Sequence, residues 1–505
     1  MTEERSTGRE AQLNNIRAAV NVAESVRSTL GPAGMDKMLT DGKHTLVTND
    51  GATILRELDV EHPGAKMVVE AAKTQEAECK DGTTSVVVLA GQMLALSEGL
   101  LMRGIHPRTV VRAFHTASQV ALDSLPEPHT AKPDVELNVA RTALRGKATE
   151  SHLDAAAELC VKAAKAVDGD LDRIRILTQA GGSIEDSYLQ EGLILSKTFS
   201  TRVEISSFEN GNVLLINGGL EGFDFKEVQM QISNAEEMNA YKQQEMQILS
   251  EVASMVAGII EGGVVFVRDG VHEAVANYLA KQGIAVVSRL QQGDMEALSL
   301  ITGLPIYHRI TDIEEGDEFT FIGEVSVRRI NDLDYVAVTS PSASVVTLLV
   351  RGATRQTLDE YERAFDDALG VACLVMKDGR AYPGGGASFS KASMGVRAHA
   401  SKESGLSARE RMCLEAYADS LEIIPAAIAA NAGMDPLDVV MELRSCPENH
   451  GLYIDRDDIG FVCDTSEHGV YEPASLVHQV ITSATEVATS ILRIDDIIGR
   501  RGEHS

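Results

Sequence analysis

The stretch DGTTSVVVLAGQML, residues 81–94, joins an Asp-Gly turn and three hydroxyl residues directly to an apolar run. The run continues to Leu101, and its length favours a buried helix, although the Val triplet also suits a strand. A second Asp-Gly turn lies earlier, in TNDGATIL at residues 48–55. One such turn is usually plain turn chemistry. Two of them before buried chain raise the hypothesis that both turns converge on a phosphate, because a glycine turn that opens a helix presents unpaired N–H groups. The rest of the sequence has to decide between this and plain turn chemistry.

Size and composition predict a large soluble protein. A chain of 505 residues with 44 % hydrophobic residues holds roughly three domains. Its 75 acidic and 46 basic residues give a formal net charge of −29. Such an acidic surface repels nucleic acid and anionic membranes, so neither is expected as a partner. The same charge suits a salt-rich cytosol, where self-repulsion is screened.

The cysteines and the N-terminus point to the cytoplasm. The six cysteines are scattered singly without a CxxC motif, which favours reduced, mostly buried thiols over disulfides or a zinc site. The N-terminal MTEERSTGREAQ has no apolar core of a secretory signal. We also expect no membrane span, since no fully apolar run approaches about 20 residues.

Helical patterns occupy both ends of the chain. Apolar residues at helical spacing begin near Leu13, and LGPAG at 30–34 ends that helix. Residues 125–137 contain three prolines and predict a linker. A last amphipathic helix is predicted near 474–498.

The middle of the chain, from about 203 to 350, has a different character. GGVVFVRDG (262–270) and GIAVVSRL (283–290) read as strands, and the amphipathic segment 271–281 separates them. This alternation predicts a βαβ unit. Residues 235–260 predict a long helix with a clear apolar stripe only in its second half. The expected fold is therefore multidomain: one largely helical domain from both termini, a connector, and an α/β insertion.

The sequence has no G-x-x-x-x-G-K-[ST], so an ordinary P-loop is excluded. Asp81 offers a carboxylate for Mg²⁺, a hard ion that prefers oxygen ligands. A small-molecule kinase is disfavoured, because the βαβ insertion carries no G-x-G-x-x-G.

Several long motifs, in order, resemble the group II chaperonins, the thermosome type of archaea. The motifs are VRSTLGPAGMDKML (26–39), TNDGATILRELDVEHPGAKMVVEAAKTQE (48–76), DGTTSVVVLAGQML (81–94), RGKA (145–148), LVRGATRQTLDEYERAFDDAL (349–369), DGRAYPGGGAS (378–388) and SATEVATSILRIDDII (483–498). The likeness extends from about residue 6 to 498 and is looser in the middle, for example in GDMEALSLITGLPI (293–306).

The resemblance implies three domains: a mostly α-helical equatorial ATP-binding domain, an α/β intermediate domain, and an α/β apical domain with a helical protrusion that serves as a built-in lid near 232–262. Helices at 271–281 and 293–302 of the apical domain would meet unfolded clients. The implied boundaries are equatorial 1–136 and 385–505, intermediate 137–202 and 351–384, and apical 203–350.

The resemblance also implies a site for ATP and Mg²⁺. Asp81 would ligate the metal, Asp50 and Asp367 would flank the attacking water, and Lys147 would approach the γ-phosphate. The residues implied to contact the nucleotide are Leu30, Gly31, Pro32, Asp50, Gly82, Thr83, Thr84, Ser85, Gly384, Gly385 and Glu472. Hydrolysis of this kind needs positioning, charge neutralisation and an oriented water more than covalent chemistry. Because Asp367 lies far along the chain from Asp81, we expect hydrolysis to depend on domain closure.

Two departures from the family pattern bear on activity. Lys80 stands where the family usually has glycine, and Ala33 stands where it usually has lysine. Lys80 either adds a cation beside the phosphates or tightens the turn. The main expectation is an ATPase that folds unfolded protein clients within a double ring of identical or paralogous subunits. The acidic composition suggests that the source is a halophilic archaeon. The alternative is a weakly hydrolysing structural or regulatory ring subunit, or a passive holdase.

Overall fold

The computed structural model describes residues 5–40, 42, 45–129, 134–200, 207–221, 235–314, 316–330, 333–341, 345–455 and 459–498. The chain divides into two compact units. The first, here called the helical unit, comprises residues 1–169, 180–185 and 352–505. The second, here called the α/β unit, comprises residues 170–179 and 186–351.

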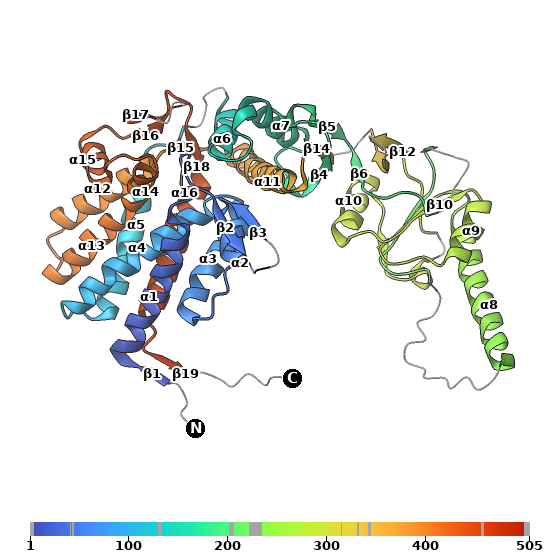
Figure 1. Ribbon diagram of the computed structural model, residues 1–505, viewed down its shortest axis with the longest axis horizontal. Helices are drawn as coiled ribbons and strands as arrows, with labels where there is room; N and C mark the ends of the chain where they lie inside the picture. The colour runs from blue at the N-terminus through green and yellow to red at the C-terminus, as the bar shows by residue number, and fades with distance from the viewer. Residues whose placement is uncertain are drawn as a thin grey trace. The chain divides into compact units, whose positions relative to one another are not determined.

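The helical unit is built around α4 (Thr83–Met102), which is apolar on nearly every side and contacts α1, α3, α13 and α16. Val86, Leu89 and Met93 of α4 are completely buried. Since α1 comes from the N-terminus and α16 from the C-terminus, both chain ends build one core, as predicted (Figure 1). The buried helix predicted from Ser85 to Leu101 is confirmed.

The described helices of this unit are α1 (Gly8–Arg27), α2 (Gly51–Glu57), α3 (Pro63–Cys79), α4, α5 (Pro107–Asp123), α6 (Val135–Leu144), α7 (Leu153–Ala166), α11 (Arg355–Asp378), α12 (Ala387–Lys402), α13 (Ala408–Leu421), α14 (Ile423–Asn431), α15 (Pro436–Ser445) and α16 (Ala474–Leu492). Its strands form antiparallel pairs: β1 (Arg5–Thr7) with β19 (Asp496–Ile498), β2 (Lys37–Thr40) with β3 (Thr45–Thr48), β15 (Ala381–Pro383) with β18 (Tyr471–Pro473), and β16 (His450–Ile454) with β17 (Gly460–Asp464).

Three expectations need correction. The last helix ends at Leu492 rather than 498, because residues 496–498 pair as β19 with β1 at the other end of the chain. The linker predicted over 125–137 is shorter, since α6 already begins at Val135, and its residues 130–133 lie outside the described residues. The expectation that no apolar run approaches the length of a membrane span is also corrected, because α4 has that length and composition. However, 61 % of its most apolar 18 residues are buried inside the protein, as in the core helix of a soluble protein.

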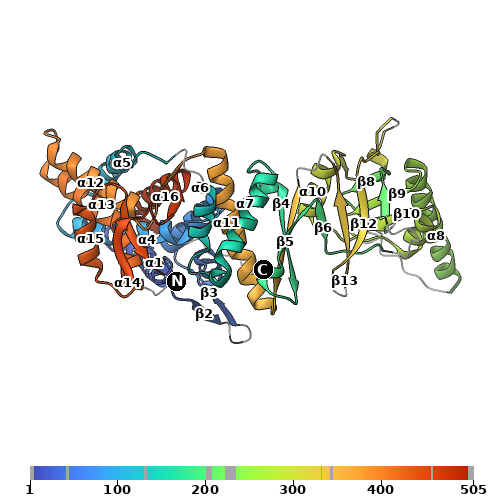
Figure 2. The same cartoon turned by 90° about the horizontal axis from the view of Figure 1, so that it is seen from above.

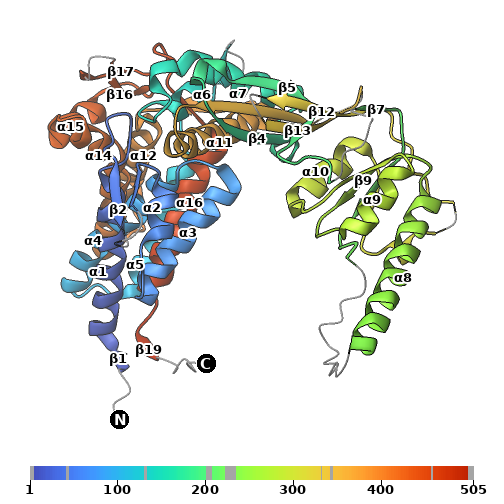
Figure 3. The same ribbon diagram turned by 45° about the vertical axis from the view of Figure 1, so that its right-hand side comes forward.

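The α/β unit contains a parallel sheet in the order β10-β9-β8-β11, covered on both faces. Alternate residues of its strands, such as Val265 and Val286, pack against α8 and α9. Figure 2 shows α8 beside the strands of this sheet, and Figure 3 shows α8 and α9 side by side. Residues of the other register, such as Phe266 and Val287, pack against α10 and the antiparallel sheet β6-β13-β12-β7. The predicted βαβ unit is confirmed, since β9 and β10 are parallel and α9 joins them.

The described helices of the α/β unit are α8 (Ala235–Ile259), α9 (Glu273–Lys281) and α10 (Gln292–Thr302). Its strands are β4 (Ile174–Ala180), β5 (Tyr188–Glu191), β6 (Leu193–Leu195), β7 (Ser207–Glu209), β8 (Val213–Ile216), β9 (Gly263–Val267), β10 (Ile284–Val287), β11 (Ile306–Tyr307), β12 (Glu324–Ile330), β13 (Leu333–Thr339) and β14 (Val346–Gly352). A third sheet has the order β4-β14-β5.

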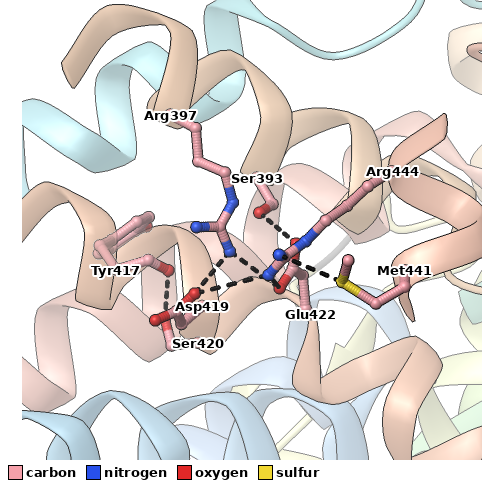
Figure 4. A network of polar contacts seen from close by, with 8 residues as sticks. All are labelled: Ser393, Arg397, Tyr417, Asp419, Ser420, Glu422, Met441 and Arg444. Atoms are coloured by element: carbon pink, nitrogen blue, oxygen red, sulfur yellow. Dashed lines mark hydrogen bonds and ion pairs between the residues drawn. The ribbon is translucent and has the colours of Figure 1, made fainter. Parts of the chain in front are cut away.

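A buried carboxylate ties four helices of the helical unit together (Figure 4). Glu422, between α13 and α14, is 6 % exposed. It accepts two hydrogen bonds from Arg444 of α15, at 2.8 and 2.6 Å, and one from Arg397 of α12 at 2.9 Å. Ser393 of α12 donates a fourth at 3.0 Å. Because the carboxylate is fully bonded, its burial is compensated.

Candidate functional site

A cavity of about 200 Å³ lies within the helical unit, where several connecting turns meet α11. All three predicted carboxylates, Asp50, Asp81 and Asp367, line it together with Lys147. Every other residue predicted from the family resemblance lines it too, except Gly384: Leu30, Gly31, Pro32, Gly82, Thr83, Thr84, Ser85, Gly385 and Glu472. Segments separated by up to several hundred positions therefore converge on one cavity.

The turn between α3 and α4 places the N-terminus of α4 at the cavity. Gly82 is the N-cap residue with φ 81°, and no described side chain caps the helix. The first-turn N–H groups of α4 thus have no competing side-chain acceptor, and the helix dipole favours an anion there. Asp81 is held from two sides: its Oδ1 accepts from the Gly82 N–H at 2.7 Å, and its carbonyl accepts from Gln75 Nε2 at 2.9 Å.

Asp50 has a structural task as well as a place in the cavity. It is the N-cap of α2, where its carboxylate accepts from the Ala52 N–H at 3.3 Å and from the Thr53 N–H at 2.8 Å. Two bonds leave further lone pairs of the carboxylate for a water or a metal-bound water. The N-terminus of α2 lies directly against that of α4, since a Cβ at Gly51 would come 2.2 Å from Thr84 Oγ1.

Gly146 brings Lys147 to the cavity beside Asp50 and Asp81. Its φ is +72°, and a Cβ there would approach the Pro32 carbonyl oxygen to 2.6 Å, so only glycine permits both the turn and the contact. The Asn49 amide donates to the Gly146 carbonyl at 2.7 Å. The turn after α6 is therefore fixed against the Leu30–Pro32 turn and the residue before Asp50. Asn49 and Gly146 were not predicted, although both stand inside the quoted motifs TNDG and RGKA.

Lys147 and Asp367 form an ion pair in the cavity wall. Burial by itself lowers the pKa of Lys147, but the carboxylates of Asp367, Asp81 and Asp50 outweigh it and raise that pKa. Burial also raises the pKa of Asp367 well above its usual range, and Asp81 and Asp50 add to this effect. Lys147 therefore stays an ammonium, while Asp367 is more basic than an ordinary aspartate and better suited to accept a proton.

Three carboxylates against one ammonium leave this part of the wall with an excess of negative charge. A polyphosphate is repelled by such a wall unless a divalent cation accompanies it. Within the described residues, no group of three or more His, Cys, Asp or Glu side chains is arranged to hold a metal by itself. Carboxylate oxygens combined with phosphate oxygens are the usual ligands of Mg²⁺. The wall therefore fits a magnesium–nucleotide better than either component alone.

The cavity also has apolar side chains in its wall, which suit the base of a nucleoside. Phe389, Ile428 and Leu452 are among its lining residues, and none of them was predicted. Glu472 also lines it; burial and then the charge of Asp81 raise the pKa of Glu472 to about 7. Tyr453 and Arg145 line the cavity as well and were not predicted; the Arg145 guanidinium lies 5.1 Å from the centre of the Tyr453 ring.

Gly384 lies beside the cavity rather than in its wall. Its N–H donates to the Val470 carbonyl at 3.0 Å, and its carbonyl accepts from Thr465 Oγ1 at 3.1 Å. Gly385 does line the cavity, and its carbonyl accepts from the Leu452 N–H at 2.9 Å. The backbone of Gly384 therefore serves the packing of β16 and β18 behind the site.

The structure distinguishes the two expectations for Lys80. Lys80 does not line the cavity, and its ammonium pairs with Asp366 at 3.2 Å, so it adds no cation to the cavity wall. Instead it occupies the left-handed C-cap of α3, with φ 61°. Ala33 also lies outside the cavity wall, although its neighbours Gly31 and Pro32 belong to it.

Comparison with known proteins agrees with this arrangement. Residues 22–501 match the profile of the TCP-1/cpn60 chaperonin family. The chain is 42 % identical to a thermosome subunit of Methanopyrus kandleri, over 99 % of this chain and 93 % of the relative. It is 40 % identical to a thermosome subunit beta of Archaeoglobus fulgidus, over 99 % and 94 %. It is 38 % identical to a thermosome subunit alpha of Halobacterium salinarum, over 98 % and 89 %. The chain belongs to the TCP-1/cpn60 chaperonin family.

Proposed function

We propose that this chain is a subunit of a cytoplasmic group II chaperonin, an ATP-dependent folding machine made of two rings of identical or paralogous subunits. The single observation that carries the proposal is the convergence of Asp50, Asp81, Asp367 and Lys147 on one cavity at the uncapped N-terminus of α4. The family membership and the full-length similarity to thermosome subunits support the same function.

The proposed chemistry is attack of a water oxygen on the terminal phosphorus of ATP, which breaks the bond from that phosphorus to the bridging oxygen and releases ADP and inorganic phosphate. The first-turn N–H groups of α4, with Thr83, Thr84 and Ser85, hold phosphate oxygens, and Leu30, Gly31 and Pro32 run along them. Asp81 holds Mg²⁺, which when bound neutralises charge on the phosphates. Asp367 accepts the proton of a water that Asp50 helps to orient. Lys147 donates to the phosphoryl group that is transferred. Gly385 and Glu472 hold the nucleoside.

Hydrolysis is coupled to movement because the site is assembled from separate elements. Asp367 reaches the cavity from α11 and Lys147 from the turn after α6, whereas Asp81 and the phosphate-binding turn belong to the α3–α4 connection. A shift of α6 and α11 relative to that connection makes or breaks the site. The division into an equatorial domain (1–136 and 385–505), an intermediate domain (137–202 and 351–384) and an apical domain (203–350) is part of this proposal.

The apical region supplies the lid and the client surface in this proposal. Residues 232–234 of the proposed lid (232–262) lie outside the described residues; α8 occupies 235–259, and residues 260–262 follow it. Leu249 and Val256 in the second half of α8 are buried against the parallel sheet, whereas Met246 is 54 % exposed. On α10, Leu300 is 47 % exposed and offers an apolar contact to a client. The acidic composition suits a salt-rich cytosol.

The test combines hydrolysis and folding in the purified protein. Steady-state ATP hydrolysis is measured with Mg²⁺ and with excess EDTA, beside refolding of a chemically denatured client enzyme. We expect Mg²⁺-dependent hydrolysis, ATP-dependent recovery of client activity, and loss of both in Asp367→Ala. Electron microscopy of the same preparations checks for double rings with and without ATP. Equal low hydrolysis in wild type and Asp367→Ala, with rings present, would refute the proposed ATPase.

The left-handed Lys80 favours a second candidate, a ring subunit with weak hydrolysis that serves a structural or holding role. Lys80 keeps an unfavourable backbone conformation where glycine would be relaxed. In that case the protein suppresses client aggregation equally well with and without ATP, and its rings form without nucleotide turnover.

A further inference from the structure

Two consecutive carboxylates of α11 each hold a lysine from a different part of the chain. Asp367 pairs with Lys147, as described above. Asp366 pairs with Lys80, and 3.2 Å separates Asp366 Oδ2 from Lys80 Nζ. The second pair joins residues 286 positions apart and connects α11 to the turn that carries Asp81.

Lys80 is held in a conformation that its own chemistry disfavours. Its φ is 61° and its ψ is −13°, and its N–H donates to the Glu76 carbonyl at 3.1 Å as the C-cap of α3. A lysine Cβ clashes locally in this left-handed region, where glycine is relaxed. Such a conformation persists only where surrounding contacts hold it.

Those contacts come from one face of α11. A Cβ placed on Gly370 would lie 2.3 Å from Lys80 Cβ and 2.6 Å from its Cγ, so the helix and the lysine stem touch where a larger residue would not fit. Asp366 and Gly370 are four positions apart and therefore share a helix face. The stem of Lys80 crosses α11 at Gly370, and its ammonium reaches Asp366 one turn away.

The next residue along the chain is Asp81, whose carbonyl is fixed to α3 through Gln75. Two contacts thus set the position of Asp81: its own hydrogen bond with Gln75 of α3, and the contact of the preceding residue, Lys80, with α11. Because α11 also carries Asp367, any contact between Lys80 and α11 acts on the separation of the two carboxylates that face the cavity.

We propose that the Lys80–Asp366 ion pair and the Lys80–Gly370 contact form a clamp, here called the Lys80 clamp, that holds the Asp81 turn to α11 and so sets Asp81 relative to Asp367. Lys80 and Asp366 are positioning residues, since neither lines the cavity. The catalytic consequence rests on the proposed ATPase function. The Lys80 and Asp366 side chains are 32 % and 39 % exposed, so salt screens their attraction.

The first test needs no ATP hydrolysis. Hydrogen–deuterium exchange of the amides of residues 80–84 is measured in the nucleotide-free protein at about 0.1 M and about 2 M KCl. We expect Lys80→Gln and Asp366→Asn each to speed exchange roughly two- to fivefold at low salt, and the difference from wild type to shrink at high salt. Lys80→Arg should keep the wild-type rate. The matched control is Lys73→Gln, which removes the exposed Lys73–Glu70 pair of the same helix and should change nothing.

The second test separates the clamp from a purely structural role. Lys80→Gln should lower kcat roughly two- to fivefold at low salt and leave KM for ATP unchanged, and the double variant with Asp366→Asn should be no worse than either single change. The clamp would be overturned if the exchange rates and kcat of Lys80→Gln equalled those of Lys73→Gln. So would single effects that simply add in the double variant. If the wild type hydrolyses no ATP, the proposed function fails, and the exchange experiment alone decides the clamp.

Discussion

Lys147 and Asp367 lie 220 positions apart in the chain and form an ion pair whose side chains are only 20 % and 11 % exposed. Asp81 and Asp50 face the same pair across the cavity and raise the pKa of both partners. One ammonium thus holds together carboxylates that would otherwise repel one another. This relationship links the stability of the empty site to its proposed chemistry.

Replacing Asp367 by asparagine should abolish proton acceptance without removing the side chain. We expect the single-turnover hydrolysis rate to fall about 10²- to 10⁴-fold, because the amide accepts no proton from water. Nucleotide affinity should change little. Asp366→Asn, at the adjacent residue, is the matched control, and its single-turnover hydrolysis rate should fall only a few-fold. Equal rates in the two variants would show that α11 contributes position but no base.

Replacing Lys147 by methionine should destabilise the nucleotide-free protein by about 3 kcal/mol, because Asp367 stays buried beside two other carboxylates without its cation. Adding Asp367→Asn should recover part of the loss, giving a coupling energy of about 1–3 kcal/mol. Urea unfolding of the four proteins measures this cycle. Lys162→Met, at the exposed Lys162–Glu158 pair on α7, is the control and should cost under about 0.5 kcal/mol. Strictly additive losses would contradict the proposed coupling.

Glu472 gives the protein a defined pH dependence. Burial, followed by Asp81, raises its pKa from 4.5 to about 7 in the folded state. The folded protein therefore holds this proton more tightly than the unfolded chain, so the free energy of unfolding falls as pH rises from about 4.5 to about 7 and is flat above. We expect Glu472→Gln to remove up to about 3 kcal/mol of this fall.

The measurement is urea unfolding of wild type and Glu472→Gln across pH 5 to 8, at one protein concentration. The comparison must be a difference between the two proteins, because burial and Asp50 also raise the pKa of Glu76 to about 7, and that group titrates in both. Glu467→Gln, on the exposed turn before β18, should follow the wild-type curve. Parallel curves for wild type and Glu472→Gln would mean that Glu472 is already ionised and hydrated.

The Glu422 network should carry much of the packing among α12, α13, α14 and α15 (Figure 4). Glu422→Gln removes the buried carboxylate from Arg397 and Arg444, which keep only the more exposed Asp419, so we expect a loss of about 1–3 kcal/mol in the free energy of unfolding. The control is Glu448→Gln. Glu448 pairs with Lys391 but is 61 % exposed, so this change should lower the free energy of unfolding by under about 0.5 kcal/mol. A Glu422→Gln protein as stable as Glu448→Gln would show that the network is dispensable.

Local patterns predicted those parts of the fold that short-range chemistry decides. The apolar run of α4, the helix near Leu13 and the βαβ unit around residues 262–290 follow from hydrophobic periodicity and turn residues. The pairing of β1 with β19 does not, because strands of only three residues acquire their conformation from a partner, which here lies at the other end of the chain.

The site residues were predicted one by one from the family resemblance, whereas the long-range contacts of the site were not predicted. The Asn49–Gly146 hydrogen bond, the Asp366–Lys80 pair and the apolar wall around Phe389 each depend on how distant segments pack. Asp367 illustrates the difference: its neighbours Glu362 and Asp366 make the segment look like solvated surface charge, yet Asp367 alone faces the buried side of α11.

The most direct test is a high-resolution structure of the assembled protein with Mg²⁺, ADP and aluminium fluoride, which mimics the phosphoryl group in transfer. The account predicts a nucleotide in the cavity, its phosphates at the N-terminus of α4, the metal at Asp81, and Asp50, Asp367 and Lys147 around the fluoride. A nucleotide bound elsewhere, or a filled cavity in which Asp367 points away from the fluoride, would contradict it.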